Sequence, residues 1–197
     1  MRRGSQNLPR AEYRSAQRSR QLIIDALISL AEEKPLSKIT VTDIVSAADI
    51  SRSTFYTHYE SIDDLVNDLE EYAVGELEKV LTDMKKNFSD KGVHDILIGI
   101  SDTLEKDKKL NRMLFSSDDT TIMAKMLRCF ADYMMDNDAI PAVIRASSRF
   151  NAMIQFFAGG ASNIYQAWFR GELGGTLRDI ADLLSETIMY QTNMFSN

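Results

Sequence analysis

The segment from Ile39 to Tyr59, ITVTDIVSAADISRSTFYTHY, constrains the fold of this chain more than any other. Thr40 can cap a short helix at its start, and Ser51 can cap a second one. The caps lie so close together that only two short helices in immediate succession fit. The two alanines before Asp49 would let these helices cross closely, and Asp49 is expected to adopt a left-handed conformation in the turn. The segment therefore predicts a helix-turn-helix.

The rest of the chain is also typical of helices, and no stretch indicates a strand or hairpin. Apolar residues recur at helical spacing in each long segment, and the 197 residues include only three prolines and nine glycines. We predict an all-α protein of about nine helices. Besides the two short ones, helices are expected at Ala16–Glu33, Ser61 to about Phe88, Val93–Lys106, Thr120–Met135, Pro141–Arg170 and Thr176–Met194. The charged stretch KDKKLNRMLFSSDD is expected to be a linking segment.

The formal net charge of −6 is unevenly distributed along the chain. Residues 1–60 hold nine Lys or Arg and seven Asp or Glu, whereas residues 61–197 hold fourteen and twenty-two. The basic excess gathers near the N-terminus, in Arg2, Arg3, Arg10, Arg14, Arg18 and Arg20. A basic arm before an acidic body suits a protein that meets a polyanion with one end, although a solvated tail would have the same composition.

The sequence gives no sign of export or membrane insertion. No stretch approaches the roughly 18 apolar residues of a membrane span, and the N-terminus lacks the apolar core of a secretory signal. We therefore expect a cytoplasmic protein without a membrane partner. The single cysteine, Cys129, shares a helical face with Ile122 and Met126 and is interpreted as a buried apolar residue rather than a redox sensor.

Motifs of common enzyme classes are missing from the sequence. There is no P-loop, no G-x-G-x-x-G, no H-E-x-x-H and no G-x-S-x-G. The two histidines, His58 and His94, have no set of metal-ligating residues around them. We therefore expect no catalytic activity, no cofactor and no metal site.

The second helix of the predicted helix-turn-helix would present short polar side chains and one arginine. Phe55 would point into the core of the domain, while its polar neighbours lie near the exposed side. Hydroxyl groups can reach phosphates or bases, and an arginine can form a bidentate bond to a guanine edge in the major groove. The segment is thus chemically suited to reading DNA.

The run ITVTDIVSAADISRSTFYTHYESIDDLV resembles the DNA-binding signature of the TetR family of transcriptional regulators. The resemblance implies that the second helix reads the major groove of operator DNA, while threonines of the first approach phosphates. It also implies that the aromatic residues and the histidine that follow lie at the DNA backbone. The implied DNA-binding residues are Thr40, Thr42, Ser51, Arg52, Ser53, Thr54, Tyr56, Thr57, His58 and Tyr59.

Three positions depart from the family pattern. The turn residue is Asp49 where glycine is common; aspartate tolerates the left-handed region better than most residues. Glu60 and Ile62 stand where family members often carry lysines, so two potential phosphate contacts are missing. The arginine-rich arm can supply the lost charge, and we expect truncation of residues 1–15 to weaken DNA binding on every sequence and to lower its salt dependence.

The two C-terminal helices are predicted to form the interface of a homodimer, because a helix-turn-helix regulator of this class needs two DNA-binding domains (reading heads) at a fixed spacing. The alternative is that their apolar faces are only intramolecular core. The expected interface residues are Ile144, Met153, Ile154, Phe157, Ala161, Ile164, Leu177, Ile180, Leu184 and Ile188. The run FFAGGASNIYQAWFRGELGG also loosely resembles regulators of dihydroxyacetone-kinase operons, some of which work through a partner protein.

An apolar effector cavity is expected in the helical body, although apolar residues at helical spacing are more often plain core. Its candidate lining residues are Met113, Phe115, Met123, Met126, Phe130, Met134, Phe156 and Trp168. We thus divide the chain into a basic arm and DNA-binding domain, residues 1–60, and a ligand-binding and dimerisation domain, residues 61–197. The preferred interpretation is a dimeric repressor that an unidentified effector releases from operator DNA. The alternative is a co-regulator with weak autonomous DNA binding that a partner protein controls.

Overall fold

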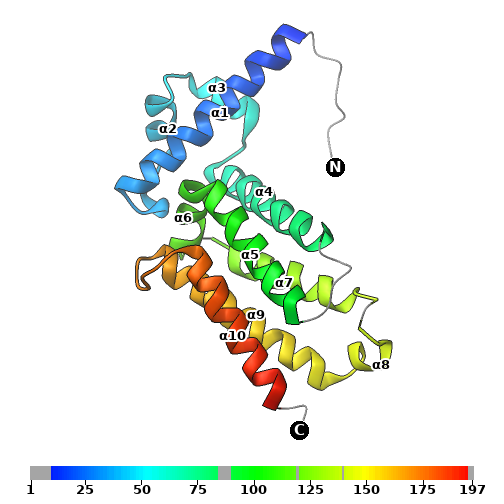
Figure 1. Cartoon of the computed structure of the whole chain (residues 1–197). Coiled ribbons are helices and arrows are strands. Elements are labelled where there is room, and N and C mark those ends of the chain that lie inside the picture. The colour runs from blue at the N-terminus through cyan, green and yellow to red at the C-terminus, as the bar shows by residue number, and fades with distance from the viewer. Residues whose placement is uncertain (1–9, 84–89, 119, 139, 195–197) are drawn as a thin grey trace. The chain divides into compact units, whose positions relative to one another are not determined.

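The computed structural model describes residues 10–83, 90–118, 120–138 and 140–194, and all regular secondary structure in these ranges is helical (Figure 1). This confirms the all-α fold predicted from the sequence. The described part of the chain contains α1 Arg10–Glu33, the 3-10 helix η1 Leu36–Lys38, α2 Val41–Ala47, α3 Arg52–His58, α4 Ile62–Asp83, α5 Asp90–Lys106, α6 Lys108–Ser116, α7 Ile122–Met135, α8 Ala142–Arg145, α9 Ser148–Phe169 and α10 Leu177–Met194.

The chain divides into two compact units, Met1–Asp68 and Leu69–Asn197. The division falls inside α4, whereas the boundary expected from the sequence lies just before that helix. None of the helices in the described ranges combines the length and the apolarity that a membrane span requires.

The first unit is built from α1, η1, α2, α3 and the start of α4 (Figure 1). Its short helices begin where side chains satisfy the first backbone amides, which have no partner within a helix. The Thr40 hydroxyl accepts a bond from the Asp43 amide (3.2 Å), and the Asp43 carboxylate accepts one from the Thr40 amide (2.8 Å). Side chains with no exposed surface fill the core between the helices: Ile23, Leu27, Ile44, Phe55 and Leu65.

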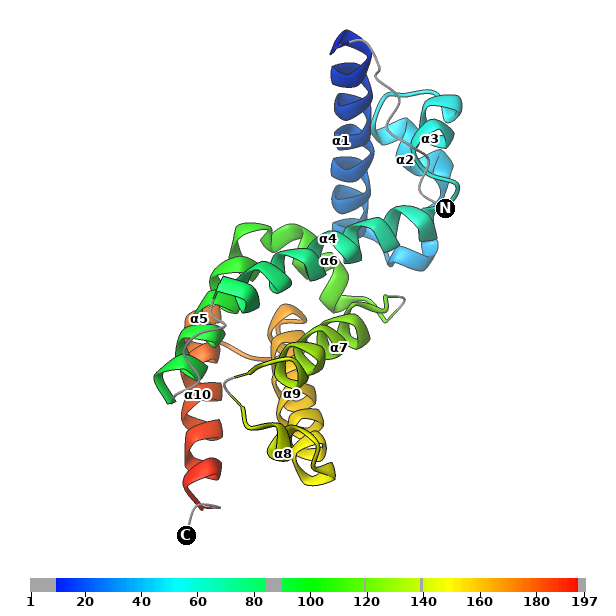
Figure 2. The same cartoon turned by 90° about the vertical axis from the view of Figure 1, so that its right-hand side faces the viewer.

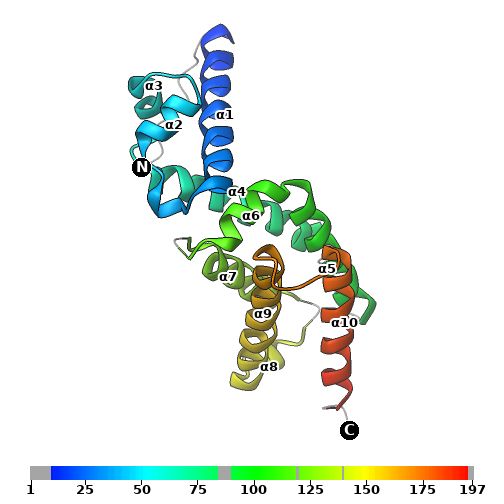
Figure 3. The same ribbon diagram turned by 90° about the vertical axis from the view of Figure 1, so that its left-hand side faces the viewer.

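In the second unit, α5 and α10 lie along each other, and α9 packs against α6 and α7 (Figures 2 and 3). A buried polar link joins three of these helices. The Ser101 hydroxyl donates to the Leu177 carbonyl (2.9 Å) and lies 2.9 Å from the Tyr165 hydroxyl. Because an unpaired buried hydroxyl is destabilising, this link fixes how α5, α9 and the start of α10 meet.

Two predicted features of the second unit are wrong. The stretch expected as a linker contains α6, because Leu110, Met113 and Leu114 form a buried helical stripe. Asn111 on this helix donates to the Leu104 carbonyl (2.9 Å), which lies in the last turn of α5 and has no partner further along that helix. The single helix expected from Pro141 to Arg170 is instead α8 followed by α9. Ser147 has an extended backbone, and its side chain accepts a bond from the Phe150 amide, so a new helix begins there.

Candidate functional site

The turn between α2 and α3 has the predicted geometry. Asp49 has φ 51°, and it is the one non-glycine residue with positive φ in the described ranges. Aspartate is tolerated in this left-handed region better than most side chains. The Ser51 hydroxyl then accepts a bond from the Thr54 amide (3.0 Å) and starts α3. The helix-turn-helix is therefore encoded by local side-chain to backbone bonds on either side of one strained residue.

One face of α3 is polar and turned away from the core. Phe55 is fully buried and anchors the helix, while the side chains of Arg52, Ser53, Tyr56 and Thr57 are exposed. Tyr56 keeps 55% of its surface accessible, although its ring packs edge-on against that of Phe55. This face offers a guanidinium, two hydroxyls and a phenol to a molecule approaching from outside.

Thr42 extends the same face onto α2. The Arg52 guanidinium donates to the Thr42 hydroxyl (2.6 Å), and both residues are exposed. The bond leaves most of the arginine's donors available and limits the directions in which the side chain can swing. An arginine held in this way loses less conformational entropy when it meets a base edge or a phosphate.

Four of the predicted hydroxyl groups serve the helices themselves. Thr40 caps α2, Ser51 caps α3, and the Thr54 and Ser51 hydroxyls lie 2.8 Å apart. The Thr57 hydroxyl donates to the Ser53 carbonyl (2.8 Å). Thr40 and Ser51 are nonetheless exposed, so each keeps a lone pair for an outside donor. Their first role is therefore to build the surface.

His58 and Tyr59 lie on the inner side of the first unit. Tyr59 is only 5% exposed, and its hydroxyl donates to the Asp68 carboxylate (3.0 Å), which also pairs with Arg20 (2.5 Å). Burial and the nearby Asp68 raise the pKa of Tyr59, so the phenol stays neutral. His58 Nε2 lies 2.7 Å from the Ser19 hydroxyl of α1. The structure thus does not place these two side chains on the exposed face with Arg52 and Tyr56.

The ring of His58 is held in its neutral form. Burial, and then the positive charge of Arg20, lower the pKa of His58 below its ordinary value. Sequence reasoning counted Arg20 only toward the basic arm and missed Ser19 and Asp68, because no local pattern links residues of α1 and α4 to His58 and Tyr59 at the end of α3. The arm that was expected to supply positive charge begins with residues 1–9, which lie outside the described residues.

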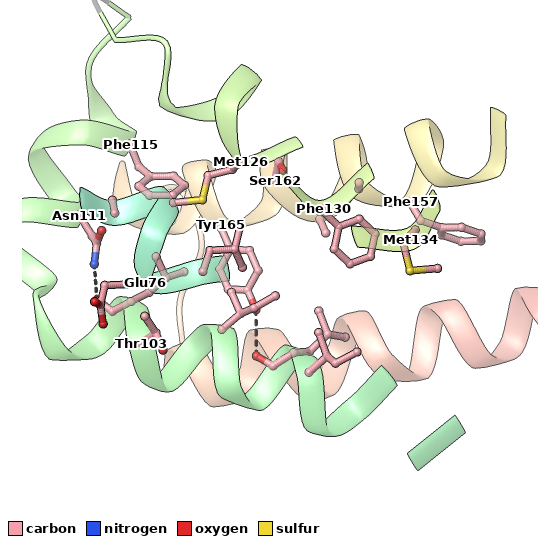
Figure 4. A pocket seen from close by; sticks show the side chains of 18 of the residues that line it. Glu76, Thr103, Asn111, Phe115, Met126, Phe130, Met134, Phe157, Ser162 and Tyr165 are labelled. Atoms are coloured by element: carbon pink, nitrogen blue, oxygen red, sulfur yellow. Dashed lines mark hydrogen bonds between the residues drawn. The ribbon is translucent and has the colours of Figure 1, made fainter. Parts of the chain in front are cut away.

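The second unit contains a cavity of about 490 Å³, a size usual for sites of small molecules. Its walls come from α4, α5, α6, α7, α9 and α10 (Figure 4). Four of the predicted lining residues are in these walls: Phe115, Met126, Phe130 and Met134. The lining residues that sequence reasoning missed include Tyr72 and Glu76 on α4 and a long row on α5.

The other four residues predicted for the cavity lie elsewhere. Met113 is buried in the core and Met123 is half-buried outside the lining. Trp168 donates its indole N–H to the Gly175 carbonyl (3.0 Å) and lies beneath Lys108. Phe156 is 70% exposed on α9.

Most residues predicted for the dimer interface face inward. Leu177, Ile180 and Leu184 are buried on α10, as Ile154 is on α9. Met153, Ile154, Phe157, Ala161 and Ile188 line the cavity, and Ile164 is half-buried. Ile144 on α8 is exposed. Helix α9 carries apolar residues on two faces, and the helical period alone cannot say which face turns inward.

Other apolar side chains of α9 and α10 face outward. Phe156 projects from the outward face of α9, and a side chain added at Gly159 or Gly160 would meet no atom within 4 Å. On α10, Leu183 is 51% exposed. A large apolar side chain beside an open stretch of backbone is a surface that another helix can approach closely.

No group of His, Cys, Asp or Glu side chains in the described ranges has the arrangement of a metal site. Cys129 is half-buried, and burial followed by the charges of Glu78 and Asp132 raises the pKa of its thiol to about 11. The thiol therefore stays protonated near neutral pH.

Comparison with known proteins agrees with this architecture. Residues 23–69 match the family model described as bacterial regulatory proteins, tetR family. No curated protein matches the sequence. The fatty acid degradation regulator FadR from Bacillus halodurans has a similar structure, with 15% identity, a TM-score of 0.64, and coverage of 85% of this chain and 93% of that chain.

Two further solved structures are similar over most of their length. The dihydroxyacetone kinase operon activator DhaS has 17% identity and a TM-score of 0.59, covering 89% of this chain and 97% of that chain. A TetR transcriptional regulator from Streptococcus agalactiae 2603V has 24% identity and a TM-score of 0.58, covering 90% and 97%. At these identities the likeness shows a common fold.

Proposed function

We propose that this chain, whose residues 23–69 match the tetR family model, is a DNA-binding transcriptional regulator of that family, and that it represses its genes as a homodimer that a small-molecule effector releases from operator DNA. The observation that carries the proposal is the exposed face of α3, where the polar side chains of Arg52, Ser53, Tyr56 and Thr57 point to solvent and are not needed for the core. Fully buried Phe55 holds the helix in place beneath them.

Arg52 is the residue best suited to read a base. Its guanidinium can donate two parallel bonds to a guanine in the major groove, and Thr42 restricts the side chain from one side. The hydroxyls of Ser53 and Tyr56 can donate to phosphate oxygens, which position the helix without carrying sequence information. The Thr57 hydroxyl can do so by rotating away from the Ser53 carbonyl. Thr40, Ser51 and Thr54 support this surface through the caps, and His58 and Tyr59 brace it from within.

A second copy of the chain is the proposed occupant of the outward face of α9. Two copies related by a two-fold axis would each bury Phe156, and the open backbone at Gly159 and Gly160 allows a close approach. In such a dimer each DNA-binding unit would contact one half-site, so two small surfaces together would bind the operator more tightly than one.

The cavity supports control by a ligand. The second half of α4 lines the cavity through Tyr72, Ala73, Glu76 and Leu77, and the same helix begins in the first unit. An effector that favours one position of this helix can therefore change the spacing of the two reading heads. Binding of the effector in the cavity then lowers the affinity for DNA, and DNA binding lowers the affinity for the effector.

The test is selection of DNA by the purified full-length protein from random duplexes, followed by fluorescence anisotropy on the selected site. We expect two inverted half-sites, binding that weakens steeply with salt, and a complex with two copies of the chain. Selection of a site without inverted symmetry, bound by one copy, would contradict the proposal.

The dimer has a separate test. Phe156→Glu should leave the helical content unchanged and yield a monomer in sedimentation, with loss of tight operator binding. Leu173→Glu is the matched control, because it charges a 39% exposed apolar residue in the loop between α9 and α10. A fully dimeric Phe156→Glu protein would contradict the proposed interface.

A co-regulator controlled by a partner protein is the second candidate function. The observation in its favour is that few groups after α3 can bind phosphate. Glu60 is exposed and negatively charged, and Tyr59 and His58 are bonded to residues of their own unit. Selection of no sequence by the purified protein, together with intact folding, would favour this candidate over the repressor.

A further inference from the structure

The two ends of the cavity differ in chemistry. At one end lie polar side chains at the junction of α5 and α6, among them Asp107 and Asn111, together with Glu76 from α4. At the other end lie only apolar side chains, including Phe130, Met134 and Phe157. Figure 4 shows the labelled polar residues Glu76, Thr103 and Asn111 on one side of Tyr165 and the three apolar ones on the other. A molecule that fills this space must itself be polar at one end only.

The cavity is long. Its lining on α9 extends from Phe150 to Tyr165, and its lining on α5 from Val93 to Lys106. At the helical rise of 1.5 Å per residue these rows are roughly 20 Å in length. Tyr165 lies between the two ends of the cavity, and its hydroxyl is already bonded to Ser101 and the Leu97 carbonyl. The middle of the cavity therefore offers a ligand mainly apolar surface. The shape suits an extended hydrocarbon chain.

The polar end carries mainly acceptors and negative charge. Glu76 and Asp107 are carboxylates, which only accept hydrogen bonds when ionised. Asp107 accepts a bond from the Tyr72 hydroxyl (2.9 Å), and this bond, with some burial, raises the pKa of Tyr72 to about 12 and keeps it neutral. One of the two amide N–H groups of Asn111 is bonded to the Leu104 carbonyl. Few donors are left to recognise an anion.

The charges at this end of the cavity come from side chains. Thr103, Lys106 and Asp107 lie where α5 ends and α6 begins, so the partial negative charge of one helix end meets the partial positive charge of the other. Lys106 is the basic residue in the lining, and it is exposed, as Asp107 is. The two carboxylates in the lining outnumber this one lysine and favour a cation at this end of the cavity.

We infer that the effector is an elongated amphiphile with a cationic head group at the Glu76 and Asp107 end and a hydrocarbon chain along α5 and α9. The inference rests on the proposed function, because it names the ligand of the cavity through which regulation would act. The faces of Tyr72 and Phe115 at this end also suit a quaternary or protonated amine, through attraction of the cation to an aromatic ring.

Lys79 supplies an internal competitor for the ligand. Its ammonium pairs with Glu76, yet Lys79 is 70% exposed and is not part of the lining. A cationic head group must share Glu76 with this lysine. Removing the lysine charge should therefore strengthen cation binding, while removing the Glu76 charge should weaken it.

The experiment is isothermal titration calorimetry of the full-length protein without DNA. The ligands are decyltrimethylammonium, decanol and decanoate, each below its micelle concentration. We expect the ammonium to bind about tenfold more tightly than the alcohol, and decanoate to bind most weakly. Glu76→Gln should lower the affinity for the ammonium by about tenfold and leave that for the alcohol unchanged. Lys79→Gln should raise the ammonium affinity several-fold.

Glu78→Gln is the matched control, because Glu78 is exposed on the same helix and is not in the lining. A second variant tests the chain end: Ala161→Leu narrows the cavity on α9 and should weaken tetradecyltrimethylammonium more than the decyl compound. All variants are checked for an unchanged circular dichroism spectrum, and Glu76→Gln and Lys79→Gln alter only partly exposed side chains.

Several outcomes would overturn the inference. They are binding of decanoate as tight as that of the ammonium, a Glu76→Gln protein that keeps the same order of ligands, or no binding of any amphiphile. Operator binding is measured in parallel without amphiphiles. A protein that binds operator and ignores the ammonium refutes this ligand class alone, whereas one that binds the ammonium and selects no DNA refutes the proposed regulator.

Discussion

The Glu70 carboxylate is the most buried acidic group in the described part of the chain, at 3% exposed. It accepts bonds from the Thr121 amide (2.5 Å), the Thr121 hydroxyl (2.7 Å) and the Lys125 ammonium (2.8 Å). These bonds tie α4 to the start of α7. Burial by itself would raise the pKa of Glu70, but the bonds from Lys125 and Thr121 outweigh burial and lower it.

Glu70→Ala should lower the free energy of unfolding by about 2–3 kcal/mol. Removing one partner of a fully buried ion pair costs about 3–5 kcal/mol, because the other charge is left unpaired. Here the cost is smaller, since Lys125 keeps 24% exposure and a second bond to Glu71, and Thr121 can regain water. For a protein of this size such a change lowers the melting temperature by roughly 5–10 °C.

The assay is urea denaturation followed by far-UV circular dichroism at fixed protein concentration. Glu71→Ala is the matched control, because Glu71 pairs with the same lysine but is 62% exposed. An exposed pair contributes about 0–1 kcal/mol, so the two neighbouring substitutions should differ clearly. Equal losses for Glu70→Ala and Glu71→Ala would refute the reasoning that burial decides the strength of this contact.

The pH dependence gives a second check on Glu70. Its pKa is lower in the folded chain than the ordinary value of 4.5, so its contribution is fully present above that value. The contribution is lost as the pH falls through the lowered folded pKa. The stability difference between the wild-type protein and Glu70→Ala should therefore be constant near neutral pH and shrink in acid below 4.5. A difference that grows in acid would have the wrong sign.

Three further predictions concern other parts of the chain. Arg52→Ala should relax preference at one base pair and weaken operator binding by about 1–3 kcal/mol, measured by anisotropy on single-base variants of the operator; an equal loss on every sequence would mean that Arg52 holds only phosphate. Asp49→Gly should raise the free energy of unfolding by up to about 1 kcal/mol, measured in urea, because glycine removes the strain of the left-handed conformation. The gain is limited because glycine also increases the conformational entropy of the unfolded chain. Cys129, with its raised thiol pKa, should react with iodoacetamide near neutral pH at least about tenfold more slowly in the folded chain than in urea, and equal rates would contradict its burial.

The helix-turn-helix was predictable from the sequence because local bonds build it. Thr40 caps α2 through a residue three positions on, and Ser51 caps α3 in the same way. Phe55 between exposed polar residues indicates the buried side of α3, and Asp49 is one of the few residue types that tolerate the turn. Each of these signals spans only a few residues, so each can be found without knowing the rest of the fold.

The second unit was predicted less well, and α9 shows why. Phe156 and Phe157 are adjacent, yet Phe156 is exposed and Phe157 lines the cavity. A helix with apolar residues on two faces gives the same periodic pattern whichever face turns inward. The packing of α6 and α7 against α9 decides the orientation, and α6 itself was missed among charged residues.

The sequence by itself thus determined the helical fold, the caps and turn of the helix-turn-helix, and the exposed face of α3, because these depend on interactions between near neighbours. Only the tertiary structure decided that Tyr59 meets Asp68 and Arg20, that Glu70 meets Thr121 and Lys125, and which side chains enclose the cavity. These contacts join residues far apart in the chain, and their free energy exists only once separate helices have packed together.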